Sequence, residues 1–321
     1  MKMPDRSEVA VWQRLPACFE LLSPAHVGFL PNRPGTVIAP TRPYVLGKNL
    51  WGAVTASLAP RLFAAPTPRD FAVTGNEVRD TLAFSYFYLS DGEQIFIPSY
   101  DKGGLRWAGV PDQEFRARFL DSRLATKISE MGGAEEASLH EIEFIRHRIG
   151  SPTTGATPVL LCGVVWVHSG SVMAARRLSI DGGRLLLQPG GSDQIELDLL
   201  DGITVGGERN YGFGRIRLVP VSPVIKRQLE ALWPDEPGTP FRLNRPLLGH
   251  APYRPDIPFR GQIEIVASRE YPGGRERSYE APGAVVSTRG HFFAPGTCFL
   301  TGEYEATIDS FGQVSLRPVC N

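Results

Sequence analysis

The chain has 321 residues, with 34 Lys and Arg against 34 Asp and Glu, so its formal net charge is zero. A hydrophobic fraction of 42% and a charged fraction of 21% are typical of a globular protein and exclude a disordered chain. The balanced charge also excludes a protein that coats nucleic acid through bulk positive charge, but it leaves room for a local basic groove.

The cysteines and the N-terminus bear on metal binding and location. The four cysteines are scattered without a C-x-x-C pair, which predicts neither a zinc site nor a disulfide framework: Cys18, Cys162, Cys298 and Cys320. The N-terminal segment carries charges where a signal peptide needs an apolar stretch. No run approaches the roughly 20 apolar residues of a membrane span. We therefore expect a cytoplasmic protein that binds no metal and no membrane.

In chain order, the first expected elements are a strand at 17–23 and a helix at 48–63, joined by a loop rich in Pro and Gly. Apolar residues recur at every fourth position of the helix and form one stripe: Leu50, Val54, Leu58 and Leu62. Pro66 and Pro68 are expected to end this helix.

The next segment is aromatic and prone to form strands. We expect a strand at 82–89 that pairs with 94–98 across a short turn. Residues 101–135 are expected to be irregular, apart from a short helix at 113–119.

The second half alternates short apolar runs with turns. Strands are expected at 139–149, 158–168, 177–180, 184–188, 215–221, 260–268, 283–288 and 298–308. Short helices are expected at 194–200 and 223–233, and a linker rich in Pro and Arg at 234–259. This order favours an α+β fold over alternating parallel α/β units.

The densest functional candidate is the segment GGERNYGFGR at 206–215, which leads into a predicted strand. Its four glycines allow positive φ angles and a close approach of the backbone to a ligand, and backbone N–H groups in such a turn can bind an anion. Arg209 and Arg215 supply positive charge, and Tyr211 and Phe213 are candidates for stacking on bases. A dinucleotide-binding fingerprint would need a helix after the glycines. From the residues alone, the segment is either a ligand cradle or a tight structural turn.

The segment GGERNYGFGRIRL resembles the glycine-rich loop of the RAMP superfamily of CRISPR-associated proteins. In that family the loop lies between the second helix and the last strand of a ferredoxin-like (RRM-like) domain. Three other segments resemble motifs of the family, in the family's order: LLSPAHVG at 21–28, YVLGKNLWGA at 44–53 and LHEIEFIRH at 139–147. The resemblance covers residues 15–220.

The resemblance implies a ferredoxin-like RNA-binding domain over 1–220, with an internal insertion near 101–135, and a linker with a smaller β-rich domain over 221–321. It implies binding of guide RNA (crRNA) without a cofactor, together with backbone RAMP subunits and a large catalytic subunit as partners. The residues expected to contact RNA lie in the loop and at the start of the first helix: Gly206, Gly207, Arg209, Asn210, Tyr211, Gly212, Phe213, Gly214, Arg215, Lys48, Asn49 and Trp51. A helix N-terminus favours anions. The alternative is that Trp51 anchors the core and Lys48 is a solvated cap.

Three roles within the family compete. The favoured one is a non-catalytic subunit that caps the five-prime handle of the guide, because such subunits carry a β-rich domain after a mid-chain glycine-rich loop, and 283–301 resembles a stretch near their ends. A repeating backbone subunit is the first alternative. Target-cleaving backbone subunits carry an Asp after the first strand, whereas 24–43 contains no Asp or Glu. A guide-processing endoribonuclease is the second alternative, and His26 is its one candidate for a catalytic base.

Outside the family, the alternative is a β-rich binding or structural protein whose glycine-rich loop is only a turn. An acyl-transfer enzyme is not expected, because the chain lacks a G-x-S-x-G motif. His140 and His147 would face opposite sides of a strand, and Cys162 and His168 would lie about 20 Å apart along one. Neither pair is therefore expected to bind a metal.

Overall fold

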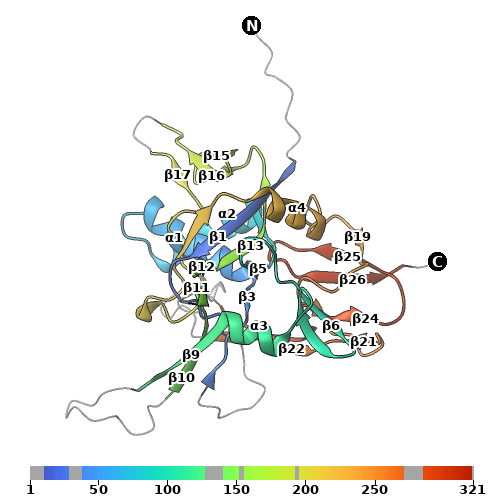
Figure 1. The fold of residues 1–321 in the computed structure, drawn as a ribbon. Coiled ribbons are helices and arrows are strands. Elements are labelled where there is room, and N and C mark those ends of the chain that lie inside the picture. Colours follow the sequence, from blue (N-terminus) through green and yellow to red (C-terminus); the bar gives the residue numbers. More distant parts are fainter. Residues whose placement is uncertain are drawn as a thin grey trace.

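The computed structural model describes residues 11–28, 38–126, 140–151, 155–191, 195–270 and 285–319, and of residues 151, 268–270 and 285–289 it describes only the backbone. The fold is mixed α/β and rich in strands (Figure 1). Within these residues, no helix is both long and apolar enough to cross a membrane. The helices are α1 (Gly47–Leu62), α2 (Pro68–Thr81), α3 (Asp112–Phe119), α4 (Pro223–Leu232) and the short 3-10 helix η1 (Arg209–Tyr211).

A six-stranded sheet forms the centre of the molecule. Its strands lie in the order β18-β1-β13-β5-β3, and β4 also pairs with β13. All of these neighbours are antiparallel. The strands are β1 (Trp12–Leu21), β3 (Tyr44–Val45), β4 (Leu82–Phe84), β5 (Phe87–Ser90), β13 (Leu160–His168) and β18 (Ile216–Val219).

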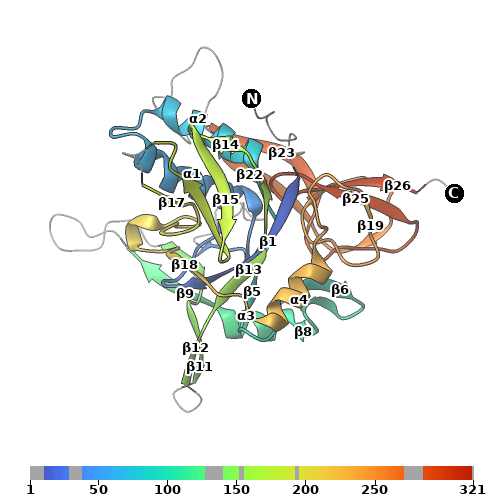
Figure 2. The ribbon, with the colours of Figure 1, turned by 90° about the horizontal axis from the view of Figure 1, so that it is seen from above.

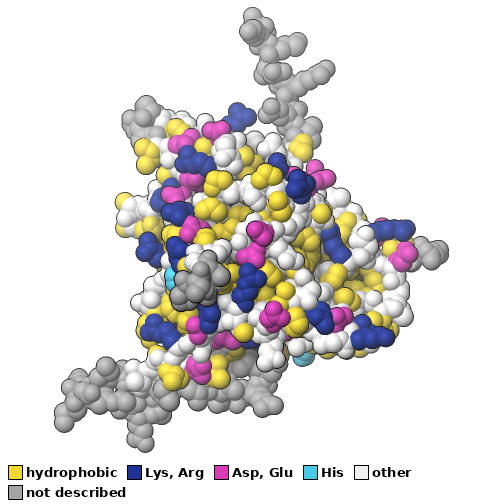
Figure 3. Space-filling view, viewed as in Figure 1, with side chains coloured by type: hydrophobic (Ala, Val, Ile, Leu, Met, Phe, Trp, Pro, Cys, Tyr) yellow, Lys and Arg dark blue, Asp and Glu magenta, His cyan; other side chains and the backbone are white. Residues whose placement is uncertain are grey.

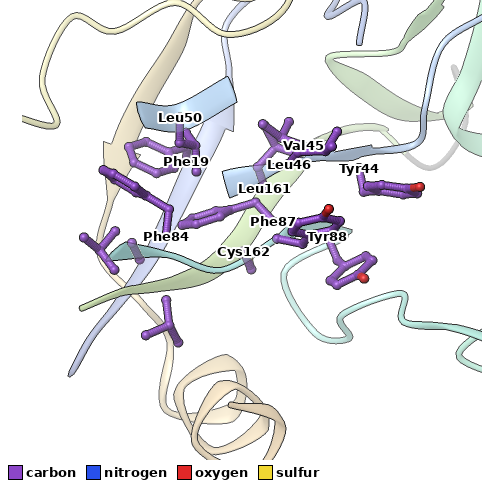
Figure 4. Packing of buried hydrophobic residues seen from close by; sticks show 14 of the residues in the cluster. Phe19, Tyr44, Val45, Leu46, Leu50, Phe84, Phe87, Tyr88, Leu161 and Cys162 are labelled. Atoms are coloured by element: carbon purple, nitrogen blue, oxygen red, sulfur yellow. The ribbon is translucent and has the colours of Figure 1, made fainter. Parts of the chain in front are cut away.

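Both faces of this sheet are covered, as the continuous burial of β13 between its end residues indicates. On one face, Leu50 of α1 lies next to Phe19 of β1 (Figure 4). On the other face, the ring of Trp166 lies 6.2 Å from that of Trp233, the residue that ends α4. The Trp166 indole also donates a hydrogen bond of 3.0 Å to the carbonyl of Pro234. The sheet therefore has a helix packed on each side.

Smaller sheets extend from this centre. Those formed before β18 are built from β6 (Pro98–Asp101), β7 (Gly104–Trp107) and β8 (Val110–Pro111); β2 (Ile38–Ala39), β9 (Leu120–Ala125) and β10 (His140–Ile145); β11 (Arg148–Ser151) and β12 (Gly155–Pro158); and β14 (Val172–Met173), β15 (Arg176–Asp181), β16 (Arg184–Gln188) and β17 (Leu197–Asp198). The β9–β10 pair projects from the body at the bottom of Figure 1. In the described residues, no α-helix lies between β13 and β18, and the only helical turn there is the 3-10 helix η1.

The C-terminal segment forms three further sheets. They consist of β19 (Phe241–Arg242), β25 (Tyr304–Ile308) and β26 (Val314–Pro318); β20 (Ala251–Pro252), β22 (Ile263–Glu270) and β23 (Val285–Phe293); and β21 (Phe259–Arg260) and β24 (Cys298–Phe299). In Figures 1 and 2, β19, β25 and β26 lie together on one side of the molecule, away from α1 and α2.

The C-terminal segment shares one buried core with the central sheet. Leu247 and Phe293 belong to the same buried cluster as Phe19. The hydroxyl of Tyr88 in β5 donates a hydrogen bond of 2.8 Å to the carbonyl of Leu248. The domain boundary near residue 220 stays a prediction.

Several expected elements are confirmed: the helices α1, α3 and α4, the strand β13, and the hairpin of β15 and β16. The helix expected at 194–200 is wrong for the described residues, because Leu197 and Asp198 pair with β16 instead. Residues 101–126 are not irregular but form β7, β8, α3 and β9, and the remainder of the expected insertion, 127–135, lies outside the described residues.

Helix α2 was not expected, because Pro68 was interpreted as a terminator. In the structure, Pro68 is the first residue of α2, where its missing N–H group costs nothing. The carboxylate of Asp70 accepts hydrogen bonds from the backbone N–H of Thr67 at 2.8 Å and from its hydroxyl at 2.6 Å. The proline and this cap start a second helix where the sequence pattern predicted only an end.

We predict that Gly163→Ala destabilises the protein by about 1–3 kcal/mol through overpacking. A Cβ at this position of β13 would lie 2.5 Å from Cδ2 of Phe87, a fully buried ring. Chemical denaturation measures the loss. In the Phe87→Leu background the same change is expected to cost less, because the ring that it meets is gone. An equal cost in both backgrounds would contradict this packing.

Candidate functional site

A cleft of about 470 Å³ lies where the glycine-rich loop, the start of α1 and the C-terminal segment meet. The loop contributes Gly206, Gly207 and Arg209, and α1 contributes Lys48, Asn49, Trp51 and Gly52. The C-terminal segment contributes Val266, Ala267, Phe311 and Gln313. Two segments that sequence analysis singled out, more than 150 residues apart, therefore form one site with a third that it did not.

Three cationic side chains of the described residues line the cleft, and one of them, Arg42, is paired with the Glu264 carboxylate at 3.2 Å. Arg42, Lys48 and Arg209 line it, and no Asp or Glu does. Elsewhere charges of both signs are interspersed, as the face in Figure 3 shows. A cleft with one sign of charge favours an anionic ligand. The net neutrality of the chain is thus compatible with a local positive site.

The glycine-rich loop is fastened to the segment that follows β1. The N–H of Gly207 donates a hydrogen bond of 2.8 Å to the carbonyl of His26, and the N–H of Gly214 donates one of 2.7 Å to that of Pro24. Gly206 has a φ of +79°, and a Cβ there would collide with the His26 carbonyl. A residue without a side chain is required at this contact.

Inside the loop, the N–H of Gly212 donates to the carbonyl of Arg209 at 2.9 Å. The N–H groups of Gly207, Gly212 and Gly214 are therefore engaged within the protein. The arginine side chains of the loop are therefore needed as donors toward a ligand in addition to its remaining N–H groups. Arg209 and Arg215 are both exposed, and neither makes an ion pair with the residues that the structure describes.

The two aromatic residues of the loop differ in exposure. Tyr211 is 49% exposed, and the guanidinium of Arg123 lies 5.1 Å from its ring. Phe213 is buried, with its ring 5.5 Å from that of Phe144 in an edge-to-face arrangement. In this structure Phe213 anchors the loop, and Tyr211 is the ring that a base could reach. Neither Asn210, Tyr211 nor Arg215 lines the cleft itself.

At the start of α1, Trp51 both packs and faces the cleft. Its indole N–H donates a hydrogen bond of 2.7 Å to the carbonyl of Gly75 in α2, and its ring lies 5.5 Å from that of Phe311. No acidic residue lies in the first turn of α1, so the positive end of the helix is not neutralised there. Lys48 and Asn49 in this turn are partly exposed.

His26 lies beneath the loop and does not line the cleft. It is 7% exposed, and its Nδ1 donates a hydrogen bond of 2.7 Å to the backbone carbonyl of Glu143. Because its own carbonyl accepts from Gly207, His26 holds the loop in place. The described residues contain no group of three or more His, Cys, Asp or Glu that could hold a metal ion.

Two of the cleft residues that sequence analysis missed, Phe311 and Gln313, come from a tight turn between β25 and β26. The side chain of Asp309 accepts hydrogen bonds of 2.9 Å from the N–H groups of both Phe311 and Gln313. An Asp followed by a Gly three residues later is a local turn signal, which was present in the sequence. Nothing local could show that this turn packs on α1.

A buried polar network lies behind the cleft. His250 is fully buried and has the Tyr86 hydroxyl 2.8 Å from its Nδ1 and the Glu264 carboxylate 3.0 Å from its Nε2. The same carboxylate accepts a hydrogen bond of 3.2 Å from Arg42, which also donates one of 3.1 Å to the carbonyl of Gly28. These contacts connect β22 of the C-terminal segment to the wall of the cleft.

Burial lowers the pKa of His250 below its ordinary value of 6.5, although the hydrogen bond to Glu264 opposes this. Burial would raise the pKa of Glu264, but the hydrogen bonds from His250 and Arg42 outweigh it and lower that pKa below 4.5. The folded protein therefore holds a neutral imidazole beside an ionised carboxylate.

No family model and no curated protein matches this chain. Among solved structures, it is similar to a chain of the type III-B Cmr-beta complex bound to cognate target RNA, with a TM-score of 0.46, 10% identity, and coverage of 88% of this chain and 86% of the other. For a chain of the same complex bound to cognate target RNA and AMPPnP, the TM-score is 0.46 and the identity 10%, with coverage of 88% of this chain and 85% of the other. For a chain of the complex in its apo state, the TM-score is 0.36 and the identity 10%, with coverage of 66% of this chain and 98% of the other. Likeness at this level establishes neither a common fold nor a common function.

We predict that the free energy of unfolding falls as the pH drops from 7 to 5, by up to about 1.4 kcal/mol per pH unit from His250. In the unfolded chain this histidine binds a proton near pH 6.5, whereas in the folded protein the buried imidazole stays neutral at that pH. The folded state therefore loses stability below pH 6.5. Glu264 adds to the loss below pH 4.5. Denaturant titrations at several pH values measure the slope.

The variant His250→Gln should have a smaller slope than the wild type between pH 7 and 5. His147→Gln, at a partly exposed histidine, is the matched control for replacing a histidine by a glutamine. Equal slopes for the wild type and His250→Gln would contradict the assignment of a neutral buried imidazole.

Proposed function

We propose that the chain is a non-catalytic subunit of a type III-like CRISPR effector complex, and that it binds guide RNA and caps its five-prime handle. The observation that carries the proposal is the cleft, where the glycine-rich loop and the start of α1 come together. Both segments resemble RAMP motifs, and the described lining contains Arg42, Lys48 and Arg209 but no acidic residue. Phosphates are attracted to such a site by charge and by the N-terminus of a helix.

The order of the central strands supports a variant of the ferredoxin-like RAMP domain. In a βαββαβ fold of this kind, the last strand lies beside the first, the first beside the third, and the third beside the second. Strands β1, β5, β13 and β18 follow that order and are antiparallel throughout. Helices α1 and α2 lie between the first and second of these strands in the chain. In the described residues, the small sheet of β14–β17 takes the position of the second helix.

The charge distribution supports an arrangement in which this chain and its partner subunits contact the same RNA. A neutral chain with a local cationic cleft contacts a few phosphates and leaves the rest of the strand to neighbouring subunits. We propose backbone RAMP subunits and a large catalytic subunit as those neighbours. The bracing role of His26, which is nearly buried beneath the loop, supports a binding function over a nuclease.

We predict that Arg209→Ala combined with Arg215→Ala weakens binding of single-stranded RNA and flattens its salt dependence. For a single strand, each lost phosphate contact should reduce the slope of log K against log salt by about 0.7. Filter binding at several salt concentrations measures both quantities.

The matched control removes the same charge from arginines that are already paired. Arg217 lies 2.6 Å from Glu20, and Arg254 lies 2.6 Å from Asp256. Arg217→Ala with Arg254→Ala should leave the affinity and the slope close to those of the wild type. If the loop variant behaves like this control, the loop is not the RNA site.

The capping role predicts one copy of the chain per complex and contacts at one end of the RNA. The test is to purify the tagged full chain with its bound partners, measure the stoichiometry, and map ultraviolet crosslinks along the copurified RNA. Crosslinks confined to the five-prime end are expected. Several copies with crosslinks at regular intervals would instead favour a backbone subunit. Copurified partners without RNA would favour a structural protein.

A further inference from the structure

We infer that the turn at 309–313 is part of the ligand site and that, with Trp51, it receives one unstacked base of the bound RNA. This inference rests on the proposed function. The phosphates would lie toward Arg209 and Lys48, and the base would lie against the exposed parts of the Phe311 and Trp51 rings, within reach of Gln313. All five side chains line the same cleft.

The turn is held rigidly at the start of α1. The N–H of Phe84 donates a hydrogen bond of 3.0 Å to the carbonyl of Ser310. Gly47, the first residue of α1, lies so close to the carbonyls of Phe84 and Phe311 that a Cβ would collide with both. Gly312 has a φ of +75°, and a Cβ there would lie 2.9 Å from the ring of Tyr86. A site built on such a turn loses little freedom when a ligand binds.

The turn presents an aromatic ring and an amide to the cleft. Phe311 is partly exposed, and its ring meets that of Trp51 edge to face at 5.5 Å. Gln313 is also partly exposed, and its side-chain amide makes no hydrogen bond to the described residues. An aromatic ring stacks on any base, and a glutamine amide offers both a donor and an acceptor to a base edge.

The size and lining of the cleft fit a nucleotide better than a bare phosphate. A volume of about 470 Å³ lies in the range of pockets that hold small organic ligands. Beside its cations, the cleft has an apolar wall of Leu46, Val266 and Phe311. An inorganic anion would leave that wall in contact with water, whereas a base would cover it.

The test combines protein variants with RNA that lacks one base. A series of single-stranded RNAs, each with an abasic site at a different position, is titrated against the full chain. In the wild type, one position should stand out, with affinity lower by about 5- to 100-fold, as expected for the loss of a stacked base. In Phe311→Ala, intact RNA should bind more weakly by a similar factor, and the abasic site at that position should cost nothing further.

Matched variants separate this contact from folding and from general RNA binding. Phe311→Leu keeps most of the packing volume and should unfold like the wild type while still losing affinity for intact RNA. Gln313→Ala should reduce the preference among the four bases at the same position, and Gln262→Ala, at an exposed glutamine outside the cleft, should not.

The outcomes distinguish this inference from the proposed function. If the loop arginine variants weaken RNA binding but the Phe311 and Gln313 variants and the abasic series do not, the cleft holds phosphates only and the inference is overturned. If the wild type binds none of the RNAs, the proposed function fails, and the inference fails with it.

Discussion

The antiparallel pairing of β1 with β13 is the interaction on which the rest of the structure depends. It runs from Trp12 opposite His168 to Glu20 opposite Leu160, at the centre of the sheet. The far edge of β1 pairs with β18, which follows the glycine-rich loop. One end of the loop is bonded to His26, in the segment that follows β1, and the other end leads into β18, which pairs with β1. The position of the loop over the cleft therefore follows from the register of β1.

The site is built by close backbone approaches as much as by charges. Gly206 meets the carbonyl of His26, and Gly47 meets those of Phe84 and Phe311. Each contact brings together segments that are distant in the chain, and each excludes a side chain at the glycine. The buried contacts of Arg42, Glu264 and His250 act in the same way, since they fasten the C-terminal segment to the wall of the cleft. The C-terminal segment is therefore part of the site.

The sequence patterns that predicted elements correctly are those that depend only on residues close to one another in the chain. The four-residue apolar repeat of α1 and the Asp-Gly-Gly turn between β15 and β16 need no distant partner to be recognised. The helix predicted at 194–200 is wrong for the described residues, because Leu197 pairs with β16 and is buried together with Leu199 and Leu200. A proline such as Pro68 can either end one helix or begin another. Here the cap formed by Asp70 starts the second helix, α2.

The sequence by itself determined which short segments carry the chemistry: the glycine-rich loop with Arg209, and the start of α1 with Lys48 and Trp51. Only the tertiary structure decided that these segments face each other, that Phe213 turns inward while Tyr211 stays exposed, and that Phe311 and Gln313 complete the cleft. The physical reason is that residue type and spacing record local preference. Which surfaces meet depends on strand register and on contacts between residues more than 200 positions apart.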